Sequence, residues 1–244
     1  MAGAMSAYGL ELESGPKRRK TMVHVPELLG CIAVGPTTEL ALAATPDAIR
    51  AFCRFMAGHG EPLDADGPVE TVVLAHVTEG DWLGNGSPYV AFESDLAPVS
   101  DVDLETFLAR HRALRAALGA WADAQTDEAL DEAPDQGRTG RAILLHALGV
   151  SGGYLASSLG SGPPGYSALA AATERGQMPL AEAFARSAEL VEARARSATE
   201  DDRRAVRERS GTIRTLRKSL RRLLEHDWEH LAELSRRPGG PSLA

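Results

Sequence analysis

The spacing of apolar residues divides the chain into two halves. Between residues 8 and 94, apolar and polar residues alternate over short runs, as in β-strands, around one helical stretch. After Pro98 the apolar residues recur every three or four positions, as in α-helices. We therefore predict an α+β protein, with a small α/β sheet domain over residues 1–97 and a four-helix bundle over residues 98–244.

Each half predicts its own elements. In the first half we expect one helix from Thr37 or Thr38 to about Gly58, a turn over residues 14–20, and strands at residues 8–13, 21–25, 30–34, 69–77 and 89–93. In the second half we expect four helices, over residues 101 or 103 to 121, 138–159, 180–196, and 199 or 213 to 236. The helix at 138–159 is apolar on nearly every side, which indicates that the bundle buries it.

Composition and charge exclude several classes of protein. The 244 residues are 43% hydrophobic and 25% charged, as in globular domains, and a net charge of −8 argues against a nucleic-acid-binding surface. No apolar run reaches the roughly 18 residues that a membrane span needs, and Met1–Ala7 is too short for the apolar core of a signal peptide. Cys31 and Cys53 fit a reducing compartment, so we expect a cytoplasmic protein.

Two histidines in the last predicted helix carry the main chemical signal. His226 and His230 are four residues apart, about one helical turn, so both imidazoles point the same way. A third histidine, His146, lies 80 residues upstream in another predicted helix. Two ligands from one helix and one from a neighbour can hold a divalent metal with a coordination position left open. We predict a metal site at His146, His226 and His230, and zinc, nickel or iron would suit it.

Two further polar residues fall on apolar helix faces. Asp227 can orient an imidazole as an outer partner of the metal site, or pair with an arginine of a neighbouring helix. His111 can act as an acid–base group in a pocket, or be a core histidine. The sequence leaves the two alternatives for Asp227 open, and for His111 it favours the core histidine.

Two other features of the second half have alternative interpretations. The arginine-rich run over residues 203–222 can contact an anion, but no aromatic residues interleave with it, which favours a solvated helix face balanced by acidic neighbours. Gly149, Gly152 and Gly153 each cost the helix about 1 kcal/mol relative to alanine. They can allow close packing of a neighbour, or leave room for a ligand just past His146.

The second half, from about Asp101 to Arg237, resembles the DinB/YfiT-like family of four-helix-bundle metalloproteins. The segment Gly137–Leu148 reads Gly-Arg-Thr-Gly-Arg-Ala-Ile-Leu-Leu-His-Ala-Leu and resembles the one that carries the family's first metal histidine. The segment His226–Leu231, His-Asp-Trp-Glu-His-Leu, resembles the family's closing His-x-x-x-His. Thr139 and Glu229 depart from the residues common in the family. The resemblance implies that His146, His226 and His230 are the metal ligands.

The first half, from about Tyr8 to Asp95, is similar to the HicB-like antitoxin domain. Val23–Cys31 reads Val-His-Val-Pro-Glu-Leu-Leu-Gly-Cys, and Gly35–Leu42 reads Gly-Pro-Thr-Thr-Glu-Leu-Ala-Leu. The resemblance implies a small sheet with one helix. The family's DNA-binding unit is replaced here by the bundle, so we interpret this half as a dimerisation or pocket-covering module, and a homodimer is one expectation.

These resemblances lead to a functional hypothesis with alternatives. The first is a metal-dependent enzyme acting on a small molecule, either an S-transferase or isomerase that uses a low-molecular-weight thiol, or a hydrolase. The second is a non-catalytic regulator whose HicB-like half binds a partner. The third is a ligand-binding stress protein without turnover.

Overall fold

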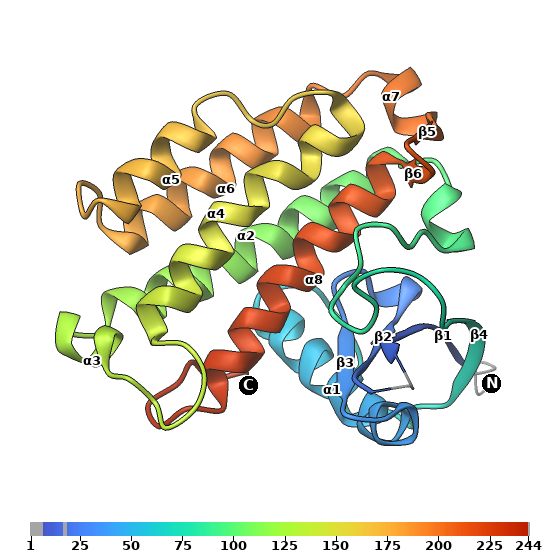
Figure 1. Ribbon diagram of the computed structural model, residues 1–244, viewed down its shortest axis with the longest axis horizontal. Helices are drawn as coiled ribbons and strands as arrows, with labels where there is room; N and C mark the ends of the chain where they lie inside the picture. Colours follow the sequence, from blue (N-terminus) through green and yellow to red (C-terminus); the bar gives the residue numbers. More distant parts are fainter. Residues whose placement is uncertain (1–6, 17–18, 244) are drawn as a thin grey trace. The chain divides into compact units, whose positions relative to one another are not determined.

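The computed structural model describes residues 7–16 and 19–243, and it contains both a mixed β-sheet and a set of helices (Figure 1). The predicted α+β class is confirmed. Residues 1–6 of the expected N-terminal stretch and residues 17–18 of the expected turn lie outside the described residues. The chain forms two compact units. One contains the chain up to Ala97 and residues 208–213, and the other contains residues 98–207 and 214–242.

The first unit is built on a four-stranded sheet with strand order β3-β2-β1-β4. Strands β1 and β2, and β2 and β3, pair antiparallel, whereas β4 runs parallel to β1. The expected hairpin is present, with Glu11 opposite His24 and Ser14 opposite Thr21. The strands are β1 (Tyr8–Ser14), β2 (Thr21–His24), β3 (Ile32–Gly35) and β4 (Thr71–Val77), and the short helix η2 (Pro26–Leu28) links β2 to β3.

Helix α1 (Thr38–Gly58) contacts β2 and β3. It starts where the sequence predicts because the Thr37 hydroxyl accepts a hydrogen bond from the amide of Leu40 and caps the first turn. Its apolar residues recur every three or four positions, so one face is buried, including Ile49, Phe52 and Met56. Pro46 lies inside the helix without ending it.

The prediction of a strand at residues 89–93 is wrong. This segment has no strand, and it leads into the short helix η3 (Glu93–Leu96). The reason lies in β1, whose Glu11 and Glu13 are buried. Glu13 accepts hydrogen bonds from the amides of Gly86 and Ser87, and Glu11 accepts one from the Ser94 hydroxyl. The two carboxylates therefore hold the residues on either side of this segment to β1 through side-chain hydrogen bonds, not through a strand ladder.

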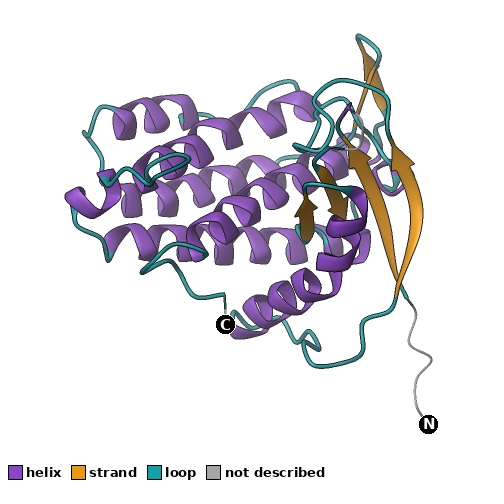
Figure 2. Cartoon of the chain, turned by 60° about the horizontal axis from the view of Figure 1, so that its bottom comes forward, coloured by secondary structure: helices purple, strands orange, loops and turns teal. Residues whose placement is uncertain are grey.

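Four long helices of the second unit pack in a closed arrangement (Figures 1 and 2). Helix α2 contacts α6 and α8, and α4 also contacts α6 and α8, so each helix has two neighbours. The long helices are α2 (Asp101–Asp123), α4 (Gly140–Leu159), α6 (Leu180–Arg196) and α8 (Leu216–Ser235). The shorter helices of this unit are α3 (Asp127–Asp131), α5 (Tyr166–Glu174) and α7 (Glu200–Arg204). The small hairpin of β5 (Arg207–Arg209) and β6 (Thr212–Arg214) lies mostly within residues 208–213, which belong to the first unit.

Helix α4 is less buried than its sequence suggests. Among the described residues it is the one helix whose length and apolar composition would allow a membrane span, yet only 39% of that apolar stretch is buried. A core helix of a bundle passes the same test, and α4 packs against α5, α6 and α8. One face of α4 is therefore exposed, although most of the helix is apolar in sequence.

Candidate metal centre

The three predicted histidines lie on two helices that pack against each other. His226 and His230 are on α8 and are buried, whereas His146 is on α4 and is exposed. Nε2 of His226 is 3.2 Å from Nε2 of His146 and 3.2 Å from Nε2 of His230. One ligand atom from each of the three imidazoles lies within 4.8 Å of the other two. The structure thus brings the three histidines together, and we call them the triad.

The triad geometry suits a small divalent metal. Two imidazole nitrogens bound to one tetrahedral zinc ion at its usual bond length are about 3.3 Å apart. The two measured Nε2–Nε2 distances of 3.2 Å are close to this value. Only one partner of such a contact can be a hydrogen donor, and His226 has two such contacts, so hydrogen bonds alone account poorly for the convergence. The residues present therefore fit a metal ion held by three imidazoles.

The electrostatics of the site keep two of the imidazoles neutral. Burial, followed by the proximity of His230 and Arg222, lowers the pKa of His226 well below its usual value. Burial, followed by the proximity of His230 and Arg138, also lowers the pKa of His146. A neutral imidazole has the lone pair that a metal ligand needs. Both residues are thus ready to bind a cation near neutral pH.

Glu233 lies next to the triad, and the sequence did not single it out. Its Oε2 accepts a hydrogen bond from Nδ1 of His230 at 3.0 Å and another from the Arg138 guanidinium at 3.0 Å. The His230 hydrogen bond, aided by Arg138, lowers the pKa of Glu233 to about 2, so the carboxylate is ionised. A proton held at Nδ1 leaves Nε2 of His230 free to accept a metal. The spacing of three residues on one helix was the available signal.

Asp227 points into the bundle core and pairs with Arg115 of α2. Its Oδ2 accepts from Nε of Arg115 at 2.7 Å and its Oδ1 accepts from Nη2 at 2.9 Å. Both side chains are fully buried, and Arg115 also donates to the Ser151 hydroxyl. The arginine pairing that the sequence allowed is the one present. Asp227 therefore links α8 to α2 instead of bonding to a triad imidazole.

His111 is also in the core and outside the triad. Its Nε2 lies 3.6 Å from Oδ2 of Asp227, and within the described chain neither ring nitrogen has a hydrogen-bond partner. Burial, followed by the positive charge of Arg115, lowers its pKa well below the usual value. His111 is thus a neutral, fully buried imidazole, which is the core position that the sequence favoured.

The arginine-rich run pairs with acidic neighbours. Arg203 pairs with Asp101, Arg207 with Asp202 and Arg217 with Asp103. Arg221 and Arg222 both pair with Glu225, and these two arginines are buried, not solvated. The expected acidic partners are present, whereas the expected solvated face holds for only part of the run.

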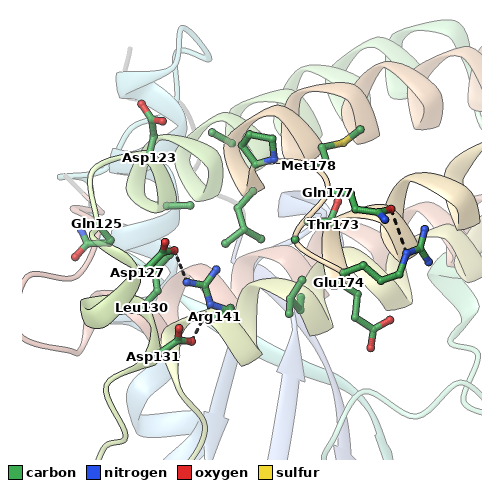
Figure 3. Close-up of a pocket in the computed structure, with 17 residues that line it drawn as sticks. Asp123, Gln125, Asp127, Leu130, Asp131, Arg141, Thr173, Glu174, Gln177 and Met178 are labelled. Carbon is green, nitrogen blue, oxygen red and sulfur yellow. Dashed lines mark hydrogen bonds and ion pairs between the residues drawn. The ribbon is translucent and has the colours of Figure 1, made fainter.

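The second unit also contains a hollow of about 800 Å³ lined by α3, the start of α4 and the loop before α6 (Figure 3). Its floor contains Arg141, which donates to Asp127 at 2.6 Å and to Asp131 at 2.7 Å. The guanidinium of Arg141 is thus already paired with two carboxylates. Within residues 7–16 and 19–243, the triad is the one group of three or more His, Cys, Asp or Glu side chains close enough to share a metal.

In comparisons with known proteins, no protein-family model, no curated protein and no solved structure matches the chain.

Proposed function

We propose that the second unit binds one divalent metal ion through His146, His226 and His230, and that the protein is a metal-dependent enzyme of the DinB/YfiT-like kind acting on a small molecule. The observation that carries the proposal is the convergence of three imidazoles from two helices, with Nε2 of His226 3.2 Å from Nε2 of each of the other two. Zinc, nickel or iron each suit three imidazoles. Bound there, the metal would supply a Lewis acid that stabilises a thiolate or lowers the pKa of water.

The protein's own residues prepare this site. Glu233 holds the proton of His230 on Nδ1, and Arg138 holds Glu233 in place through its second hydrogen bond. Burial keeps His226 neutral, and the exposed position of His146 leaves one side of the triad accessible from solvent. An accessible side is what separates a catalytic metal site from a closed structural one. This supports an enzyme over a regulator in which the bundle is only structural.

Two activities fit the proposal, S-transfer or isomerisation with a low-molecular-weight thiol, and hydrolysis. Zinc-loaded protein is expected to accelerate either the attack of a small thiol on 1-chloro-2,4-dinitrobenzene or the hydrolysis of 4-nitrophenyl acetate. His226→Ala should abolish the acceleration, and His111→Ala, outside the triad, should retain most of it. Equal rates for wild type and His226→Ala in both assays would contradict an enzymatic role.

We also propose that the protein acts in the cytoplasm. Cys31 and Cys53 are both buried and are not joined in a disulfide, as expected for a reducing compartment. A test is the distribution of the tagged full chain between cytosolic and membrane fractions, where recovery in the membrane fraction would contradict the proposal.

A further inference from the structure

The face of α4 that carries His146 is exposed along its length. At about 100° per residue, four positions lie within about 40° of His146 on the helix surface, and Gly149 lies about 60° to one side, so that with His146 they make six positions, whereas Ile143, about 60° to the other side, is buried. All six are exposed, and the sequence gives none of them a formally charged side chain. They are Ala142, His146, Gly149, Val150, Gly153 and Ser157. The triad therefore lies at one point of a continuous, uncharged surface strip.

The glycines of α4 fall into two groups. An added Cβ at Gly152 would lie 2.5 Å from Cδ1 of Tyr166, so Gly152 is required by packing. At Gly149 and Gly153 an added Cβ would meet nothing within 4 Å, and both are helical residues without a positive φ. Neither packing nor backbone conformation thus explains these two glycines, although each weakens the helix relative to alanine.

What Gly149 and Gly153 share is their position beside the triad. They lie three and seven residues beyond His146, so Gly153 is about 10 Å from His146 along the helix axis. The ring of Tyr154 stands at the edge of the same strip, 5.7 Å from the His226 ring. Because glycine has no side chain, these two successive turns of α4 leave the helix backbone uncovered on the side next to the triad.

We infer that the part of this strip beyond His146 is the substrate-binding surface of the metal site, and that it takes a small molecule with one metal-binding head and an uncharged, apolar body that lies along α4 over Gly149 and Gly153. The inference rests on the proposed metal site. The three converging imidazoles fix where the head must be, and the uncharged strip excludes a body that needs charged partners. Glycine at two turns allows the body to approach the helix backbone closely.

A pair of hydroxamates tests this surface, because they share a metal-binding head and differ only in their tails. Acetohydroxamate has a methyl group, whereas octanohydroxamate has an alkyl chain long enough to reach Gly153. We expect octanohydroxamate to bind the zinc-loaded full chain about tenfold more tightly in calorimetric titrations, since part of its tail is removed from water.

Two matched variants test where on the strip the alkyl tail of octanohydroxamate binds. Gly153→Gln puts a polar side chain on the strip beyond His146, and Ala142→Gln puts the same side chain on the strip before His146. Gly153→Gln should remove most of the affinity advantage of octanohydroxamate, and Ala142→Gln should keep it. Zinc content and acetohydroxamate affinity should be unchanged in both variants.

Three results would overturn the inference. Equal affinity of the two hydroxamates for zinc-loaded wild type would show that the tail finds no surface. An advantage that Gly153→Gln leaves intact, or that Ala142→Gln removes equally, would place the tail elsewhere. A chain that binds no zinc would overturn the metal site and this surface together, whereas the first two results would leave the metal site standing.

Discussion

Nδ1 of His230 lies 3.0 Å from Oε2 of Glu233, three residues further along α8. This contact fixes which nitrogen of His230 carries the proton, and so which nitrogen can bind a metal. Glu233→Gln should therefore lower zinc affinity about 10- to 100-fold while the fold is retained. The affinity can be measured by competition with a chromophoric chelator. Glu229→Gln on the same helix is the matched control, and an equal loss in both variants would contradict a specific role of Glu233.

The buried Arg115–Asp227 pair predicts a large effect on stability. Arg115→Met would leave the Asp227 carboxylate in the core without its partner, which typically costs about 3–5 kcal/mol. Urea unfolding of the full chain measures the loss. Arg186→Met removes an exposed pair with Glu182 on α6 and should cost less than about 1 kcal/mol. Similar losses in the two variants would show that the buried pair is not needed for stability.

Replacing glycines of α4 by alanine is expected to change the free energy of unfolding in opposite directions at different positions. Gly149→Ala and Gly153→Ala should raise the free energy of unfolding by up to about 1 kcal/mol each, because alanine is the better helix former and the added Cβ meets nothing. Gly152→Ala should lower it, since its Cβ would collide with the Tyr166 ring. Thermal melts of the metal-free variants separate these cases, and destabilisation by Gly149→Ala would show that the glycine has a packing role.

Asp103 predicts a pH-dependent contribution to stability. Burial alone would raise the pKa of the Asp103 carboxyl group. Hydrogen bonds from Ser100 and the Arg217 guanidinium outweigh it, so the pKa of Asp103 is lowered. Because the folded pKa is below the unfolded one, the stabilisation is present above about pH 4 and is lost as the pH falls through the folded pKa. Asp103→Asn should thus destabilise the protein by up to about 1 kcal/mol at pH 7 and by less at pH 3. The same difference at both pH values would contradict the assignment.

The sequence predicted most helices because their apolar residues and caps act locally. The Thr37 cap of α1 lies at one of the two expected positions, and α6 spans the expected residues 180–196. Helix α5 was missed because its run of alanines lacks a clear apolar period, and its burial depends on contacts with α4 and α6. The segment at residues 89–93 has the composition of a strand, but buried carboxylates on β1 hold the residues on either side of it, and these are contacts that spacing along the chain does not indicate.

The triad could be predicted because ligand spacing on a helix is a property of the sequence. Its surroundings could not, because they depend on which helices pack together. The partner of Asp227 comes from α2, 112 residues away, and spacing alone does not identify it. The crowding of Gly152 follows from where Tyr166 lies, whereas Gly149 has no neighbour of this kind, and both are tertiary properties.

Metal content tests the central claim most directly. Full-length protein purified without chelator and analysed by mass spectrometry should contain about one zinc, nickel or iron ion per chain. His226→Ala should contain almost none while its circular dichroism spectrum matches that of wild type, and His111→Ala should keep its metal. Wild-type protein without metal, whose melting temperature neither zinc nor nickel raises, would contradict the claim that these three imidazoles hold a metal.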